Sequence, residues 1–274
     1  MSLKINGIQI KHHLYPDRTV LLRFSCTDLT PPVVIDWRYE YPNELIVLQF
    51  LVAHLNEHGY DDIILHMPYI PYARHDRAPS DEDLLLLKHF ASIVNGLNFT
   101  SVQVLDPHSY VSQNLFKHIR IEQPTHFVEK ALKDIQQQET IPVTLFFPDE
   151  GAMKRYGSAY KQKYCFGIKK RDWETGEILG LDLAGHTESV AEHPILIIDD
   201  ICSAGGTFHY AAEKLKKVGA GNIYLWVTHC EETIYHGKLL MENSLIQHIY
   251  TTNSLVRPAH EKITEIPISE KFYF

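Results

Sequence analysis

The sequence lacks the features that mark secreted, membrane-embedded and nucleic-acid-binding proteins. It has only four cysteines in 274 residues, too few for a disulfide scaffold, and their spacing matches no metal-binding motif. No apolar run reaches the roughly 18–20 residues that a membrane-spanning helix needs, and the first residues lack the apolar core of a signal peptide. The net charge of −8 argues against electrostatic binding of nucleic acid. We therefore expect a cytoplasmic protein without nucleic-acid or membrane partners.

What is present indicates a globular α/β protein. Hydrophobic residues make up 45% of the chain and charged residues 22%, which allows one large core or two modest ones. The periodicity predicts strands at 63–67, 102–105, 143–147, 195–198 and 222–227, and helices at 45–58, 83–95, 127–138 and 210–219. Ser80 or Asp81 is expected to cap the second helix. The alternation predicts mainly parallel sheets in two consecutive halves, roughly 1–140 and 141–274, with a hairpin or flap in the first 45 residues.

Polar side chains follow several predicted strands at the point where each strand ends. They are Asp106, His108, Asp149, Asp199, Asp200 and His229. Open α/β sheets bind ligands at the carboxyl ends of their strands, so we expect the functional residues there. Most of the other histidines, including the His12–His13 pair, belong to no recognisable constellation.

The segment from Ile195 to Phe208 is the most informative stretch. Four aliphatic residues predict a buried strand that ends at Asp199 and Asp200, and a small-residue loop over 203–207 then leads into a helical pattern. A strand–loop–helix of this kind points backbone N–H groups and a helix N-terminus at one spot, which suits a phosphate. The two carboxylates can accept hydrogen bonds from sugar hydroxyls or meet a metal ion. The predicted ligand is a phosphorylated sugar.

Six motifs in order resemble those of the ribose-phosphate pyrophosphokinase family, whose members make 5-phosphoribosyl-1-pyrophosphate. The motifs span roughly residues 60–230 and comprise Met67–Arg77, Leu105–His108, Pro148–Gly151, Lys169–Arg171, Leu196–Thr207 and Thr228–His229. The resemblance implies two phosphoribosyltransferase-like α/β halves with mainly parallel sheets, ATP as co-substrate, Mg²⁺ as cofactor and a homo-oligomeric assembly. It implies transfer of the β,γ-diphosphoryl group of ATP to the anomeric hydroxyl of ribose 5-phosphate, releasing AMP.

The same resemblance assigns roles to individual residues. It places Lys169 and Arg171 in a catalytic flap and His108 and Asp149 at the metal. The segment that handles ATP contributes Arg74, His75, Asp76 and Arg77, and Tyr15 and Asp17 correspond loosely to the family's adenine-contacting loop. The sugar phosphate is assigned to the acids and loop that end the strand at 195–198: Asp199, Asp200, Ser203, Ala204, Gly205, Gly206 and Thr207.

Elementary chemistry supports these assignments but leaves plainer interpretations open. Guanidinium groups such as Arg74 and Arg77 can grip phosphates in a fork, although either could also be a surface residue. A cationic hairpin carrying Lys169 and Arg171 could neutralise the transferring phosphates, or it could be a basic turn in solvent. His75 could contact ATP or merely pack.

Several departures from the family pattern bear on the substrate. Ser203 and Ala204 stand where the family usually has an aspartate and a threonine, and His75 replaces a glutamine. The opening segment of the family is shortened here, and its C-terminal helix is hard to find after Arg257. These differences put the sugar acceptor, the hexamer and the allosteric sites of the family in question.

Three functional classes compete on this evidence: a pyrophosphokinase, a phosphoribosyltransferase that shares the 196–207 loop, and an inactive regulatory homologue. Within the first class, an alternative acceptor is a ribose whose 5-phosphate carries a further group, such as ADP-ribose. That reaction would give ADP-ribose 1-pyrophosphate in a pathway that rebuilds NAD. The small side chains of Ser203 and Ala204 would leave room for the extra group.

Overall fold

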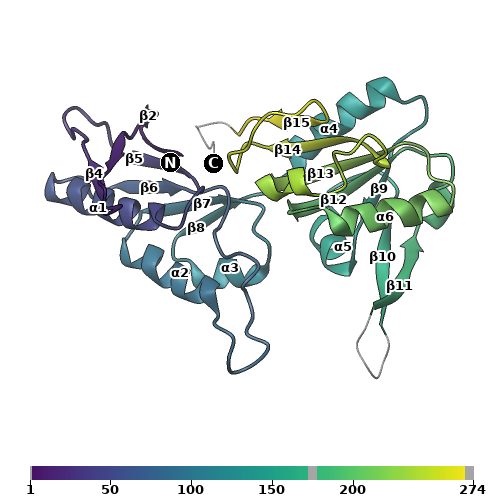
Figure 1. Cartoon of the computed structure of the whole chain (residues 1–274), viewed down its shortest axis with the longest axis horizontal. Helices are drawn as coiled ribbons and strands as arrows, with labels where there is room; N and C mark the ends of the chain where they lie inside the picture. Colours follow the sequence, from purple (N-terminus) through teal and green to yellow (C-terminus); the bar gives the residue numbers. More distant parts are fainter. Residues whose placement is uncertain (1, 172–177, 269–274) are drawn as a thin grey trace. The chain divides into compact units, whose positions relative to one another are not determined.

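The computed structural model describes residues 2–171 and 178–268, with only the backbone described for Ser2, 169–171 and 178–181. The chain forms two compact units (Figure 1). The first unit contains the chain up to Gln123 together with Ser254–Val256 and Ile268, and the second contains Pro124–Asn253 and Arg257–Pro267. No helix in the described part of the chain is both long and apolar enough to cross a bilayer.

The first unit is built around a six-stranded sheet in the order β2-β1-β5-β6-β7-β8. Strands β5 to β8 are mutually parallel, whereas β1 pairs antiparallel with both β2 and β5. A separate antiparallel hairpin, β3–β4, occupies part of the N-terminal region that was expected to be a hairpin or flap. The strands of this unit are β1 (Ser2–Ile5), β2 (Ile8–Gln9), β3 (His12–Leu14), β4 (Val20–Leu22), β5 (Val33–Arg38), β6 (Ile63–His66), β7 (Ser101–Leu105) and β8 (Ile119–Glu122).

Helices α1 and α2 of the first unit each bury one apolar face. Helix α1 (Glu44–Glu57) buries Val47, Leu48, Leu51 and Leu55, which recur at the three- and four-residue spacing of one helical face. Helix α2 (Leu86–Gly96) does the same with Leu87, Phe90, Ala91 and Val94, and α3 (Tyr110–Leu115) is a short helix after β7. The apolar periodicity therefore sets which face of each helix packs inward.

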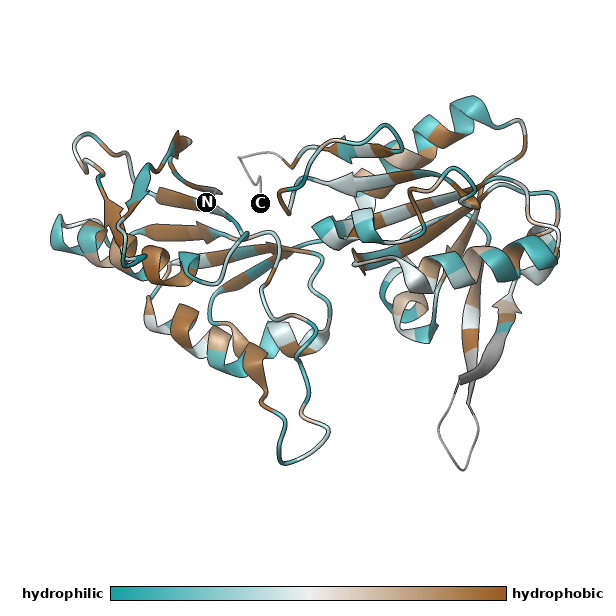
Figure 2. Cartoon of the chain, viewed as in Figure 1, coloured by the Kyte–Doolittle hydropathy of each residue, from teal (hydrophilic) through white to brown (hydrophobic). Residues whose placement is uncertain are grey.

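The second unit contains a seven-stranded sheet in the order β11-β10-β9-β12-β13-β14-β15. All neighbouring strands are parallel except the β10–β11 hairpin. The central strands β12 and β13 each begin with a run of buried apolar residues, as expected for a parallel sheet covered on both faces (Figure 2). The strands are β9 (Thr144–Phe147), β10 (Tyr164–Arg171), β11 (Ile178–Gly185), β12 (Ile195–Cys202), β13 (Ile223–Cys230), β14 (Ile246–Thr252) and β15 (Ile263–Ile266).

In the described part of this unit, one α-helix precedes β9, and two α-helices and two short 3₁₀ helices lie between the strands. They are α4 (Thr125–Gln138), α5 (Glu150–Tyr156), α6 (Gly206–Lys217), η1 (Thr187–Ser189) and η2 (Glu232–His236). Helix α6 buries Phe208, Ala211, Ala212 and Leu215 against the sheet and shows hydrophilic residues elsewhere (Figure 2). A loop of three residues, 203–205, joins β12 to the N-terminus of α6. Because both elements pack in the same core, they fix the position of this loop.

The structure confirms the predicted α/β class and corrects some local expectations. Helix α2 begins at Leu86 rather than near residue 83, and neither Ser80 nor Asp81 caps it; the Ser80 hydroxyl instead donates to the Asp83 carboxylate at 2.7 Å. Strand β12 does not end at the paired acids but continues to Cys202. Helix α4 groups with the second unit, whereas the sequence-based division at residue 140 placed it in the first half; that division stays a prediction.

Candidate active site

Strand β12 presents the paired acids to an arginine from α5. The Arg155 Nη2 atom lies 2.8 Å from Asp200 Oδ1 and 3.1 Å from Asp199 Oδ1. The Asp199 carboxylate also accepts a hydrogen bond of 3.0 Å from the backbone N–H of Asp200. The side chains of Asp200 and Asp199 are 3% and 19% exposed. One cation therefore holds both carboxylates in place near the end of the strand.

Burial and mutual repulsion act on this acid pair. Burial raises the pKa of Asp199 well above its usual range, and the neighbouring Asp200 raises it further, while Arg155 acts in the opposite direction. Carboxylate oxygens accept hydrogen bonds from hydroxyl groups, so the acid pair suits the hydroxyls that a sugar presents.

The loop between β12 and α6 turns on a glycine in the left-handed conformation. Gly205 has φ of +80° and precedes the first residue of α6. A Cβ atom at this position would lie 2.3 Å from Leu239 Cδ1, so the loop requires glycine for its dihedral angle and for its packing. Gly206 has nothing within 4 Å of its own Cβ position. The open N-terminus of α6 leaves backbone N–H groups available to an anion.

The segment containing η2 backs this loop. The Ser203 and Thr233 hydroxyl oxygens are 2.9 Å apart, and the backbone N–H of Glu231 donates to the Cys202 carbonyl at 2.8 Å. Gly237 lies so close to the Ala204 carbonyl oxygen that a Cβ atom there would overlap it. Ser203, which replaces the family's aspartate, is therefore tied to its neighbour on η2.

Asp149 lies after β9 and begins α5. Its Oδ1 atom accepts a 3.0 Å hydrogen bond from the backbone N–H of Ala152, which makes it the N-cap of the helix that carries Arg155. The cap explains why the chain turns into a helix directly after the strand. One aspartate thus combines a local structural role with its predicted metal-binding role.

The residues expected to handle ATP lie in the first unit, between β6 and α2. Asp76 is buried, whereas Arg74, His75 and Arg77 are exposed, and the Arg77 side chain is 80% exposed. The ring of His75 meets the edge of Tyr72, whose φ is +64°. Exposed guanidinium groups remain accessible to a polyanion, so the geometry is compatible with the ATP-binding prediction without testing it.

The other predicted positions fall into three places. His108 follows β7 in the first unit and is partly exposed. Tyr15 and Asp17 form the turn of the β3–β4 hairpin, where Asp17 Oδ1 accepts hydrogen bonds from the Thr19 N–H at 2.9 Å and the Thr19 hydroxyl at 2.7 Å. These bonds lower the pKa of Asp17, the side-chain bond being the main cause. The backbones of Lys169 and Arg171 lie in β10, but their side chains and residues 172–177 lie outside the described structure.

Arg155 is the residue of this site that sequence reasoning missed. It lies six residues beyond Asp149, on the last turn of α5. A basic residue on a short helix ordinarily indicates a solvated face, and only the packing of α5 beside β12 shows otherwise. No local pattern links Arg155 to the acid pair, because Asp199 lies 44 residues further along the chain.

Comparison with known proteins supports the family resemblance. The ribose-phosphate pyrophosphokinase of Sulfolobus acidocaldarius is 26% identical over 271 residues, which cover 96% of this chain and 90% of that protein. The enzyme of the same name from Corynebacterium ammoniagenes is 28% identical, covering 82% of this chain and 70% of that protein. No family model matches the chain.

A solved structure shares the fold. The phosphoribosylpyrophosphate synthetase of Mycobacterium smegmatis superposes with a TM-score of 0.76 and 18% identity, covering 94% of this chain and 85% of that one. The likeness extends over both units and confirms the predicted phosphoribosyltransferase-like architecture.

Proposed function

Because the chain is a divergent relative of the ribose-phosphate pyrophosphokinases over nearly its whole length, we propose that it transfers a diphosphoryl group from ATP to ribose 5-phosphate. The products are AMP and phosphoribosyl pyrophosphate. The observation that carries the proposal is the acid pair of β12, which Arg155 holds beside a loop entering the N-terminus of α6. The relatives are ribose-phosphate pyrophosphokinases, which supports a ribose phosphate as acceptor and gives no support to ADP-ribose.

The acceptor chemistry follows from this geometry. The ribose 2- and 3-hydroxyls hydrogen-bond to Asp199 and Asp200, and the 5-phosphate takes hydrogen bonds from the backbone N–H groups at the start of α6. Arg155 keeps the two carboxylates from separating when the ring enters. The anomeric hydroxyl is left unbound by these groups, so its oxygen is the nucleophile that attacks the β-phosphorus of ATP.

The donor side needs positive charge. In diphosphoryl transfer the bond from the β-phosphorus to the α,β-bridging oxygen breaks as the bond to the anomeric oxygen forms, and AMP leaves. Arg74 and Arg77 are the proposed triphosphate ligands, and Lys169 and Arg171 the proposed stabilisers of the charge that develops in the transition state. The sugar proton passes to solvent or to a nearby base.

Mg²⁺ is the proposed cofactor, and Asp149 is a donor that fits it. Asp149 offers a partly exposed carboxylate at a strand end, which is the hard oxygen ligand that Mg²⁺ prefers. The family resemblance also assigns His108 of the first unit to the metal, directly or through water, and that assignment stays a prediction. When bound, Mg²⁺ neutralises phosphate charge and orients the triphosphate.

The test is acceptor-dependent release of AMP from ATP by the purified chain with Mg²⁺. We expect AMP and phosphoribosyl pyrophosphate to appear with ribose 5-phosphate and little AMP without an acceptor. Asp200→Asn should raise the KM for ribose 5-phosphate more than the KM for ATP. AMP release with ADP-ribose but not ribose 5-phosphate would change the acceptor, and no release with either would overturn the proposed activity.

A further inference from the structure

Cys26, His54 and His58 come together in the first unit. One potential ligand atom from each side chain lies within 4.8 Å of the others. Cys26 follows β4 in an irregular segment, while His54 lies in the last turn of α1 and His58 caps its C-terminus. We propose that this triad binds a zinc ion that clasps the segment after β4 to the end of α1.

The donor set selects a transition metal rather than Mg²⁺. A thiolate and two imidazoles are the ligands that Zn²⁺ takes in four-coordinate protein sites, with Zn–S near 2.3 Å and Zn–N near 2.0–2.1 Å. Those bond lengths require ligand atoms roughly 3.3–3.6 Å apart in a tetrahedron. The three ligand atoms lie within 4.8 Å of one another, so small side-chain rotations, easiest for the exposed His58 ring, bring them to that spacing.

The helix and its surroundings prepare the two histidines for this role. Residues four apart lie on one face of a helix, and the rings of His54 and His58 are 4.4 Å apart between centroids. His58 Nδ1 lies 2.8 Å from the backbone carbonyl oxygen of His54, so Nδ1 carries the proton and Nε2 keeps its lone pair. A histidine that binds a metal through one ring nitrogen ordinarily donates the N–H of the other to a carbonyl or carboxylate oxygen. The negative end of the α1 dipole also favours a cation here.

The cysteine is held from the other side. Its side chain is buried, and its backbone carbonyl accepts a hydrogen bond of 2.8 Å from the Tyr60 hydroxyl. Tyr60 lies just beyond α1, so this bond already joins the Cys26 segment to the end of the helix. The metal therefore reinforces an existing attachment, and Cys26 releases its thiol proton on binding.

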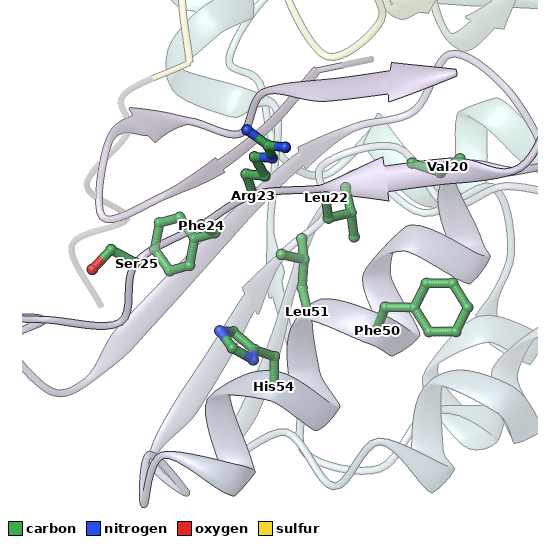
Figure 3. Close-up of a pocket in the computed structure, with 8 residues that line it drawn as sticks. All are labelled: Val20, Leu22, Arg23, Phe24, Ser25, Phe50, Leu51 and His54. Carbon is green, nitrogen blue, oxygen red and sulfur yellow. The ribbon is translucent and has the colours of Figure 1, made fainter. Parts of the chain in front are cut away.

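A cavity provides access and a fourth ligand. It measures about 660 Å³ and is lined by His54 together with Leu22, Phe24, Phe50 and Leu51. In Figure 3 the His54 ring projects from α1 toward the segment that carries Phe24 and Ser25. Three protein ligands leave one position on a tetrahedral ion, which water from this cavity can fill.

The triad escapes sequence reasoning because its members are far apart in the chain. Cys26 lies 28 residues before His54, and no short motif links a cysteine at that distance to a histidine pair. Only the packing of the post-β4 segment against α1 brings the thiol to the imidazoles.

The experiment is a cobalt titration of the full chain after removal of metals with a chelator. Excess Mg²⁺ is added so that it occupies any site made of oxygen ligands and keeps Co²⁺ from binding there. We expect one Co²⁺ per chain with the absorption of a tetrahedral ion and a thiolate-to-cobalt charge-transfer band, both abolished by one equivalent of Zn²⁺. Zn²⁺ should also raise Tm, because it binds the preformed site of the folded state more tightly than the unfolded chain.

Variants separate this site from adventitious binding. Cys26→Ser should abolish the charge-transfer band. His58→Gln changes an exposed position, so the variant should fold like the parent. It should weaken Zn²⁺ binding by about 100-fold or more, because changes to outer-shell partners alone cost about 10–100-fold. His89→Gln, an exposed histidine on α2, is the control and should bind as the parent does. Absence of the band, its persistence in Cys26→Ser, or unchanged affinity in His58→Gln would overturn the proposal. Diphosphokinase activity is not a readout, so the two proposals fail independently.

Discussion

Arg155 Nη2 lies 2.8 Å from Asp200 Oδ1, and this contact joins the helix that follows Asp149 to the acid pair of β12. The same nitrogen reaches Asp199 at 3.1 Å. Two acids on one strand, one of them almost fully buried, would repel each other without this cation. A single guanidinium thus fixes the geometry on which the proposed sugar site depends.

Replacing Arg155 by glutamine should damage both stability and acceptor binding. It removes the cation that contacts both carboxylates, one of them almost fully buried, which costs about 3 kcal/mol in unfolding free energy. We also expect KM for ribose 5-phosphate to rise more than KM for ATP. Lys154→Ala is the control, because Lys154 is 70% exposed and pairs only weakly with Glu150 at 3.7 Å. Denaturant unfolding and steady-state kinetics measure the two effects.

The stability loss should depend on pH in a defined direction. Burial already raises the pKa of Asp199, and loss of Arg155 raises it further. The folded variant then binds more protons than the unfolded chain above the ordinary aspartate pKa of about 4. The unfolding free energy of the variant should therefore increase as pH falls from neutral toward about 4. The difference in unfolding free energy between the parent and the variant should become smaller over the same range. An equal difference at pH 5 and pH 8, or no difference at all, would contradict the role given to Arg155.

The loop glycine offers a test of backbone geometry. Gly205→Ala places a β-carbon in the left-handed region and against Leu239, so we expect a loss of about 2 kcal/mol in unfolding free energy. Gly206→Ala is a closely matched control, since it has space around it and should stay within about 0.5 kcal/mol of the parent. Urea denaturation of the two variants side by side decides the matter. Equal stability would show that the loop does not need its left-handed residue.

Strand β12 illustrates how much of the fold could be predicted from the sequence. The run of aliphatic residues at 195–198 correctly predicted a buried strand, because continuous hydrophobicity is a local property of parallel strands. Its end was predicted too early, since pairing with β13 continues through Ile201 and Cys202 and overrides the polarity of the acids. Backbone pairing depends on the neighbouring strand, which the local pattern does not contain.

The candidate site divides in the same way. Asp199, Asp200 and the glycine loop are contiguous in the chain, so their spacing was visible as a motif. Arg155 enters from a different element, and its role depends on how α5 packs beside β12. The Cys26 triad is a more distant case of the same kind. These residues could be identified only from contacts between elements, which a short stretch of sequence does not reveal.

A third prediction concerns the metal and the helix cap together. Asparagine caps helices about as well as aspartate, so Asp149→Asn should retain the hydrogen bond from Ala152 and the parent's stability. Its Mg²⁺ requirement should nevertheless rise about 10-fold or more, because a charged ligand is lost. Asp149→Ala should lose about 1 kcal/mol in addition, through the missing cap. Activity against Mg²⁺ concentration and thermal unfolding separate the two roles.

The control for this prediction is Glu150→Gln, which changes an exposed neighbouring acid. We expect His108→Ala to shift the Mg²⁺ curve in the same direction as Asp149→Asn. Parent-like Mg²⁺ curves in both variants would place the metal elsewhere.

The proposed flap gives a kinetic prediction. If Lys169 and Arg171 stabilise the transferring diphosphoryl group, alanine at either position should lower kcat by about 10²–10⁴-fold, the usual size of a lost transition-state contact. ATP affinity should change little, because the interaction develops in the transition state. Lys161→Ala, an exposed lysine just before β10, is the control. Near-normal kcat in both variants would show that Lys169 and Arg171 have no catalytic role.

The last prediction asks whether the departures in the acceptor loop choose the substrate. The double change Ser203→Asp and Ala204→Thr restores the residues usual in the family and breaks the contact between Ser203 and Thr233. A bare terminal phosphate leaves room for the threonine hydroxyl as an added donor, so activity with ribose 5-phosphate should be retained or improved. A group beyond the phosphate would meet added bulk and negative charge, so any activity with ADP-ribose should fall. Measuring kcat/KM for both acceptors, with Ser203→Ala as the control for the lost hydroxyl contact, tests this directly. Unchanged values for both acceptors in the double variant would show that positions 203 and 204 do not select the acceptor, whereas a loss confined to ribose 5-phosphate would show that this chain positions its phosphate differently from its relatives.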